Sequence, residues 1–288
     1  MQLSHFKTLW GHPGDAADAA RLAVDAGFQG LEAPLPTDDG DRDALGRALA
    51  AYGLRWIQEI CTAGSYVPRR QATVEEHLAD FEAQLATGRE LGAEFANVMG
   101  GCDAWSIDDS VRFFSEAQDI ATGLGVTASF ETHRGRSFFC PWNTVAILER
   151  VPELAVTCDF SHWAVVCERL PDTEWDSIER VAEQALHVHS RVGYDQGPQV
   201  PHPGAPEFAG ALAAHQRCWE AVWSSQRRRG LAETTMTPEF GPDGYLHTLP
   251  FTGAPIADLW DLNRWIADCE RRHFQQWSVP HDLKRQAV

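Results

Sequence analysis

The stretch that decides the fold is Gly125–Arg136, which reads GVTASFETHRGR. It begins like a buried strand and ends in an acid, an imidazole and two guanidinium groups. A surface hairpin would scatter such residues along its length, and a strand inside a core would exclude them. The stretch is therefore typical of a buried strand whose far end opens into a site.

Short apolar runs of this kind recur along the chain, and segments with helical spacing separate them. The runs lie at 6–11, 30–35, 54–62, 95–101, 126–133, 154–162, 185–191 and 234–241. Glycines such as Gly53 and Gly125 precede several runs, where they are expected to end the helices. No linker or composition shift divides the chain, and no Gly-x-Gly-x-x-Gly of a doubly wound fold follows an early strand. The alternation predicts an α/β protein with a single (β/α)8 TIM barrel over 1–288, ending in an extended tail from about 278.

Composition narrows the class of protein. An apolar content of 44% and 11 tryptophans supply a large core, which excludes general disorder. The seven cysteines are an odd number without a Cys-x-x-Cys, so we expect reduced thiols and neither a disulfide framework nor a cysteine zinc site. No apolar run reaches the ~20 residues of a membrane span, and the start of the chain lacks the apolar stretch of a signal peptide. We therefore expect a cytoplasmic protein with no membrane partner.

The formal charge of −17 makes nucleic acid an improbable partner, because phosphates would be repelled unless a basic patch were set apart. The one dense basic run, Arg227–Arg229, comes before Gly230 at the end of a helical segment. Basic residues at that place are expected to serve the helix C-terminus.

Strand phase brings a set of polar residues together. Residues two apart on a strand share a face, and in the last four runs the polar residue at the strand end shares its face with small or polar residues. The opposite faces are apolar. The phase predicts that four side chains point into the barrel mouth at similar height, namely Glu131, Asp159, His189 and Glu239.

Converging carboxylates repel one another, and a divalent cation removes that repulsion. Three carboxylates and one imidazole indicate one Mn²⁺ ion, with Mg²⁺ or Co²⁺ as alternatives, rather than structural zinc. Each residue alone is also consistent with a salt-bridge partner, a helix cap or a core histidine. The inward-facing polar residue at the end of each of four consecutive strands favours a metal site over these alternatives.

Four motifs carry a resemblance to a known family. They are FETHRG (130–135), CDFSHW (158–163), HVHSR (187–191) and PEFGP (238–242). In this order, and together with WGH (10–12), they resemble the xylose isomerase-like TIM-barrel superfamily, nearest to its sugar phosphate isomerase/epimerase branch, which includes ketose 3-epimerases.

The resemblance implies that Glu131, Asp159, His189 and Glu239 bind the metal, and that Glu131 and Glu239 also move protons. It implies that His162 contacts a substrate oxygen and acts in catalysis. The implied activity is isomerisation or epimerisation of a keto-sugar, by proton abstraction next to a carbonyl through a metal-stabilised enediolate. We expect a homo-oligomer, a dimer or tetramer.

The chain departs from that branch after strand seven. Epimerases of the branch usually carry an arginine some six residues after the metal histidine, whereas Arg191 follows His189 by two. Arg191 is in phase with His189, so we expect it to turn inward and contact substrate. The loop 194–203 is expected to set which sugar fits; a subunit-contact loop is the alternative.

Further substrate-binding candidates stand near strand ends. His133 and Arg134 follow Glu131, and Arg134 could equally form an outer ion pair. Glu59, like Glu32, ends an early run, where a salt bridge is the alternative. Trp10, His12 and Trp142 are candidates for an apolar wall, although core packing is the commoner role of a tryptophan.

Other functions remain open. If the carbon next to the enediolate bears a leaving group, the same site would be a lyase or dehydratase that acts by β-elimination on a 3-keto-glycoside. An abasic-site endonuclease, which uses several zinc ions and must bind DNA, is disfavoured by the acidic charge. A non-catalytic sugar-binding protein would not need both glutamates. No phosphate-binding glycine loop is visible, which favours a non-phosphorylated sugar.

Overall fold

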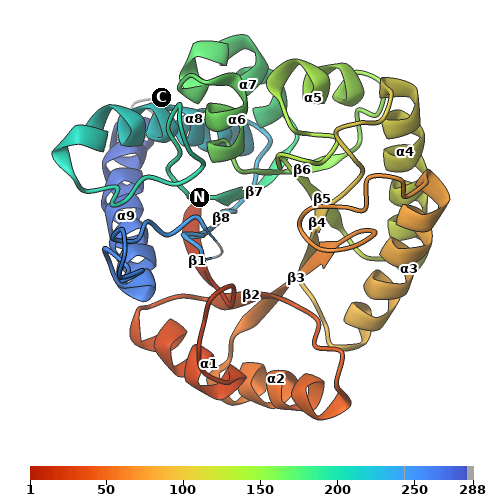
Figure 1. Cartoon of the computed structure of the whole chain (residues 1–288), viewed down its shortest axis with the longest axis horizontal. Coiled ribbons are helices and arrows are strands. Elements are labelled where there is room, and N and C mark those ends of the chain that lie inside the picture. The colour runs from red at the N-terminus through yellow and green to blue at the C-terminus, as the bar shows by residue number, and fades with distance from the viewer. Residues whose placement is uncertain (243, 284–288) are drawn as a thin grey trace.

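The computed structural model describes residues 1–242 and 244–283, and it confirms a closed barrel of parallel strands in the order β1 to β8. Figure 1 shows the barrel end-on, with helices forming an outer ring around it. The strands are β1 Gln2–Thr8, β2 Gly30–Pro34, β3 Arg55–Cys61, β4 Phe95–Met99, β5 Ala128–Glu131, β6 Ala155–Cys158, β7 Ala185–His189 and β8 Glu233–Thr237. The (β/α)8 prediction is confirmed.

The helices alternate with the strands. They are α1 Ala16–Asp25, α2 Asp39–Tyr52, α3 Val74–Glu90, α4 Ile107–Leu124, α5 Pro141–Leu148, α6 Ser161–Cys167, α7 Trp175–Ala182, α8 Ala209–Arg228 and α9 Leu259–Leu283, with 3-10 turns at Pro171–Glu174 and Pro206–Phe208. Gly53 and Gly125 cap α2 and α4 in the left-handed conformation, as predicted. Within the described residues, no helix is long and apolar enough to cross a bilayer.

Two predicted boundaries are wrong. The first strand is Gln2–Thr8 rather than 6–11, because Gln2 to His5 pair with β8 and Phe6 to Thr8 pair with β2. The extended tail from about 278 is helical as far as Leu283, and residues 284–288 lie outside the described part. The ring of Trp277 lies 5.4 Å from that of Trp223, and this packing supports the last turns of α9.

The two faces of the strands behave as the phase predicts. Phe130, Val156, Val188 and Met236 are buried in the core between the sheet and the helices. On the inner face the Thr157 hydroxyl donates to Ser129 Oγ at 2.8 Å, and His187 Nδ1 lies 2.7 Å from Thr235 Oγ1. The pairing of β6 with β7 shifts register between Val156 and Thr157. Such irregularities re-aim side chains beside active sites, and this one lies directly below the site.

Candidate metal centre and active-site cavity

The four side chains predicted to converge do so. Glu131 is the last residue of β5 and His189 the last of β7, while Asp159 and Glu239 follow β6 and β8 by one and two residues. One potential ligand atom from each lies within 4.8 Å of the others. All four side chains are buried, and Asp159 and His189 are fully so.

The electrostatics of this cluster are unfavourable for its acids. Burial raises the pKa of Glu131, and the charges of Glu239 and Asp159 raise it further against the lowering effect of His189. Burial also raises the pKa of Asp159, in spite of its contact with Arg191. Burial alone would lower the pKa of His189, but Glu239, Glu32 and Glu131 raise it well above its usual value. The cluster therefore attracts positive charge.

His189 has the orientation of a ligand. Its Nε2 lies 2.9 Å from Glu32 Oε1. Its Nδ1 is buried and makes no hydrogen bond, although Glu239 Oε2 lies 2.9 Å away and Glu131 Oε1 3.6 Å away. A buried imidazole nitrogen without a hydrogen bond, facing carboxylate oxygens, fits a divalent cation held by oxygen and nitrogen ligands.

Arg191 turns inward, as its phase predicts, and is almost fully buried. Its Nη2 forms a close ion pair with Asp159 and lies 3.4 Å from Glu239 Oε2. The same nitrogen lies 2.7 Å from Nε2 of His162. Burial lowers the pKa of His162 well below its usual value, and the nearby His133 and Arg191 lower it further. A neutral His162 accepts a hydrogen bond there. His162 thus holds Arg191 in place and is itself fully buried.

A cavity of about 480 Å³ opens beside the cluster. Glu131, Glu239 and Arg191 line it on the cluster side. Other parts of the wall include Trp10, Tyr245, His133 and Glu59, together with Cys61 at the end of β3 and residues 64–66 of the loop that follows. The ring of Trp10 packs edge-on against Tyr245 at 5.1 Å. A Cβ at Gly241 would lie 1.8 Å from the Trp10 ring, so only glycine allows this wall.

Two of the sequence candidates on the cavity wall carry usable polar groups. Burial raises the pKa of Glu59 to about 8, and Glu239, Glu32 and Glu131 add to this. Nδ1 of His133 lies 2.5 Å from the Arg134 carbonyl, so it donates there and leaves Nε2 as an acceptor. Arg134 places its guanidinium 5.0 Å from the Tyr245 ring centre and supports the wall from behind.

Arg136, the second cation of the opening stretch, has a structural place. Its guanidinium is fully buried and donates to the carbonyl oxygens of Thr62, Ser65, Tyr66 and Gly101. These bonds hold the loop after β3 against the barrel, and that loop forms one wall of the cavity.

Three predicted wall elements lie elsewhere. His12 lines a separate hollow between α1 and the start of α9, with Nε2 3.6 Å from Asp18. Trp142, at the start of α5, is 53% exposed and does not line the cavity. Among the described residues of loop 194–203, none lines it either. The buried side chain of Gln199 instead accepts a hydrogen bond from Gly241 N at 2.8 Å, which fixes the segment after β8.

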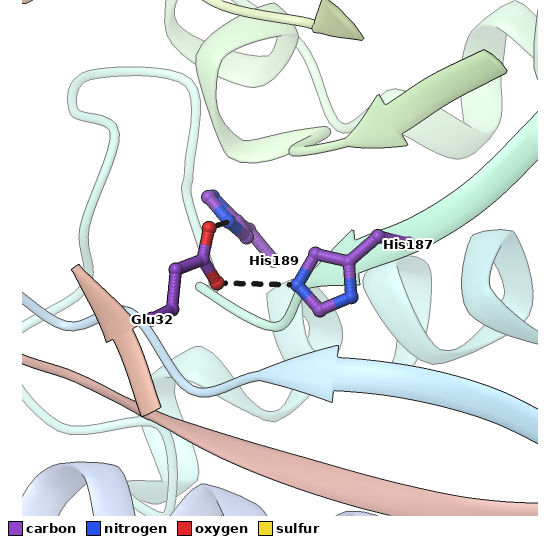
Figure 2. A group of neighbouring side chains, drawn as sticks. All are labelled: Glu32, His187 and His189. Atoms are coloured by element: carbon purple, nitrogen blue, oxygen red, sulfur yellow. Dashed lines mark hydrogen bonds and ion pairs between the residues drawn. The ribbon is translucent and has the colours of Figure 1, made fainter. Parts of the chain in front are cut away.

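Sequence reasoning missed the support beneath the cluster. Asn97 of β4 is fully buried and its Nδ2 donates to Glu32 Oε1 and Glu131 Oε2, each at 3.0 Å. Glu32 of β2 accepts from His187 and His189 (Figure 2). Asn97 was not singled out in the sequence, because β4 looked like an ordinary apolar run. Glu32 was a candidate for substrate binding or a salt bridge, and it lies in ion-pair contact with His187 and His189.

A family model described as xylose isomerase-like TIM barrel matches residues 20–196, which is more than half of the chain. The chain belongs to the xylose isomerase-like TIM barrel family. Its ligand-bearing strands β5 and β6, and β7 with its histidines, lie inside the matched region. No curated protein sequence matches the chain significantly.

Solved structures of this family type resemble the chain in fold. A 3-keto-D-glucoside 4-epimerase from E. coli is 14% identical, with a TM-score of 0.61 over 94% of this chain and 100% of the other. A probable 3-DHS dehydratase from Bacillus anthracis is 14% identical, with a TM-score of 0.58 over 92% and 97%. Endonuclease IV from Thermus thermophilus is 15% identical, with a TM-score of 0.56 over 96% and 100%.

At these identities the likeness establishes the fold alone. The three proteins differ in reaction type, so the barrel does not distinguish an epimerase from a dehydratase or an endonuclease. The distinction must come from the side chains of this site.

Proposed function

We propose that the protein is a divalent-metal-dependent isomerase or epimerase of a keto-sugar or sugar derivative. The observation that carries the proposal is the difference in exposure within the ligand cluster. Glu131 and Glu239 line the cavity, whereas Asp159 and His189 are fully buried behind them. Two carboxylates in contact with a bound substrate, on neighbouring sides of one site, are what proton removal and return require.

Glu131, Asp159, His189 and Glu239 would hold the metal, with Mn²⁺ as the preferred ion and Mg²⁺ or Co²⁺ as alternatives. Bound there, the ion would stabilise negative charge that develops on a substrate oxygen. Of the two glutamates, one removes the proton from the carbon next to the carbonyl and the other returns a proton. Whether the product is an epimer or an isomer depends on the face or carbon to which the proton returns.

The remaining residues bind and orient the substrate. Arg191 and His133 offer a donor and an acceptor to substrate oxygens, and Trp10 and Tyr245 offer an apolar wall to a sugar ring. The cavity volume of about 480 Å³ suits a small sugar or a glycoside.

A lyase acting by β-elimination is the second candidate, and Glu59 favours it. A carboxyl with a pKa of about 8 is largely protonated at neutral pH. On the cavity wall it would protonate a leaving oxygen. An endonuclease is disfavoured, because a chain with a net charge of −17 repels a phosphate backbone.

Turnover of a panel of keto-sugars and 3-keto-glycosides in deuterated water tests the proposal. Metal-loaded protein should incorporate deuterium at the carbon next to the carbonyl, and metal-stripped protein should be inactive. Unlabelled product would point to a hydride shift or to a different reaction and would reject the proton-transfer mechanism. Release of an aglycone would identify the lyase.

Metal analysis tests the ligand assignment independently of any substrate. Wild type should retain one divalent ion per chain, and His189→Ala and Glu239→Gln should lose it. Full retention in both variants would reject the assignment.

A further inference from the structure

We propose that Glu32 is the positioning residue of the metal centre, because it fixes the proton of His189 on Nε2 and, through Asn97, the orientation of Glu131. This inference rests on the proposed function, since it assumes that His189 and Glu131 are ligands. It assigns a role to a buried acid on β2, which lies across the barrel from β6 and outside the ligand-bearing strands β5 to β8.

Glu32 lies between the two histidines of β7. It is 1% exposed, and its two carboxylate oxygens face different histidines, as Figure 2 shows. Oε1 lies 2.9 Å from Nε2 of His189, and Oε2 lies 3.3 Å from Nε2 of His187. The carboxylate therefore bridges the two inward-facing histidines of β7.

Glu32 is saturated with hydrogen-bond donors. Oε1 also accepts from Asn97 Nδ2 at 3.0 Å, and Oε2 accepts a close hydrogen bond from the Thr237 hydroxyl. His187 is itself held by Thr235 at Nδ1 and by Thr237 at Nε2. A cation placed among Glu32, His187 and His189 would have to displace these donors. The group is therefore better suited to orienting ligands than to binding a second metal.

The acceptor role of Glu32 determines which nitrogen of His189 carries the proton. Oε1 of Glu32 accepts from Asn97 and Oε2 accepts from Thr237, so the group presents acceptor oxygens to both histidines. Nε2 of His189 must then donate to Oε1. In the neutral imidazole this leaves Nδ1, which faces Glu131 and Glu239, as the nitrogen with the free lone pair.

Asn97 carries the same control to a second ligand. Its two amide hydrogens are directed at Glu32 Oε1 and Glu131 Oε2, both 3.0 Å from Nδ2. One oxygen of Glu131 is thus occupied, and the other lies on the side of His189 Nδ1. A single buried carboxylate orients both ligands, one directly and one through an amide.

The experiment compares Glu32→Gln with a matched control. The glutamine amide is nearly isosteric with the carboxylate. Its NH₂ group is a donor, however, and would face a histidine nitrogen or the Thr237 hydroxyl, which donate to the carboxylate in wild type. Titration of metal-stripped protein with Mn²⁺ should give an affinity about 10–100-fold lower than wild type, as for other outer-shell partners. Glu270→Gln is the control, because Glu270 is also fully buried but is bound by Gln216 outside the barrel. Its affinity should equal that of wild type.

A spectroscopic measurement on wild type does not depend on a variant that folds. In Zn²⁺-loaded protein with ¹⁵N-labelled histidine, the wild-type signal that is absent from the spectrum of His189→Ala belongs to His189. That signal should show the imidazole proton on Nε2. A proton on Nδ1, or an Mn²⁺ affinity of Glu32→Gln within about threefold of wild type, would overturn the role of Glu32. Failure of the proposed metal site would look different, because wild type and His189→Ala would then bind Mn²⁺ equally.

Discussion

Glu32 and Glu131 are both glutamates at the ends of barrel strands, both almost fully buried and both beside His189, yet their pKa values move in opposite directions. Glu32 is surrounded by donors from Asn97, Thr237 and the two histidines. Glu131 faces two further carboxylates. The acid surrounded by donors is stabilised as an anion and suited to orient its neighbours, whereas the acid among other acids is destabilised as an anion and suited to bind a cation.

The largest expected effects come from replacing each of the two glutamates, Glu131 and Glu32, by glutamine. Glu131→Gln should lower turnover about 10²–10⁴-fold, because a proton-transfer group is removed. In the metal-free protein it should not lower the free energy of unfolding, since the folded state disfavours the anion at this place. Glu32→Gln should lower that free energy by about 3 kcal/mol, because a buried N–H is left facing other donors. Urea denaturation of stripped proteins measures both, and a loss of equal size would contradict the comparison.

Arg191→Met tests two acids of the metal-ligand cluster, Asp159 and Glu239. The guanidinium is the cation in contact with Asp159 and Glu239, so its removal leaves the buried Asp159 without its close cation and leaves Glu239 with His189 alone. The free energy of unfolding of metal-free protein should fall by about 3–5 kcal/mol. A bound metal ion supplies positive charge, so Mn²⁺ should raise the melting temperature of the variant more than that of wild type. An equal rise in both would show that Arg191 and the metal act on different groups.

The sequence predicted the four metal-ligand candidates better than the support beneath them, Glu32 and Asn97, for a physical reason. Alternation along a strand shows which face a side chain occupies, and Glu131, Asp159, His189 and Glu239 follow from it. It does not show which residue across the barrel that side chain meets, and the role of Glu32 depends on His187 and His189 opposite.

Loops were harder still to predict. Gln199 was expected within a specificity loop, and Arg136 was noted only as a cation of the opening stretch, but each holds a backbone segment. Their partners are main-chain groups, which carry no signature in a sequence. His12 lies in a loop, where strand alternation gives no orientation, and Trp142 lies in the first turn of α5, outside the cavity lining.

The metal-free protein should also lose stability as the pH rises. His189 keeps its proton in the folded state above its usual pKa of 6.5, while the unfolded chain releases it. The folded state then binds more protons, so the free energy of unfolding decreases as the pH increases from about 6.5 through the raised pKa of His189. The proton of His189 should contribute at most about 1.4 kcal/mol per pH unit to the slope. Glu59, with a pKa of about 8, adds a slope of the same sign up to that pH. Saturating Mn²⁺, which requires the deprotonated imidazole, should remove the contribution of His189. Thermal melts between pH 6 and 9, with and without Mn²⁺, measure it, and a slope in metal-free His189→Ala equal to that of wild type would assign the effect elsewhere.

The smallest effects on activity are expected from Trp10 and Trp142, which were both predicted as candidates for an apolar wall. Trp10 lines the cavity, stacks edge-on against Tyr245 and lies 5.7 Å from the Arg191 guanidinium. Trp142 is 53% exposed at the start of α5, outside the cavity. Trp10→Ala should lower kcat/KM through a higher KM, because the apolar wall of the substrate site is removed, and should leave the Mn²⁺ affinity unchanged. Trp142→Ala should leave kcat, KM and metal affinity unchanged and shift the free energy of unfolding by no more than about 0.5 kcal/mol. Steady-state kinetics of the two variants with one substrate compare them directly. If Trp142→Ala raises KM as much as Trp10→Ala does, substrate extends beyond the cavity described, and the division between a cavity wall and an ordinary surface residue is wrong.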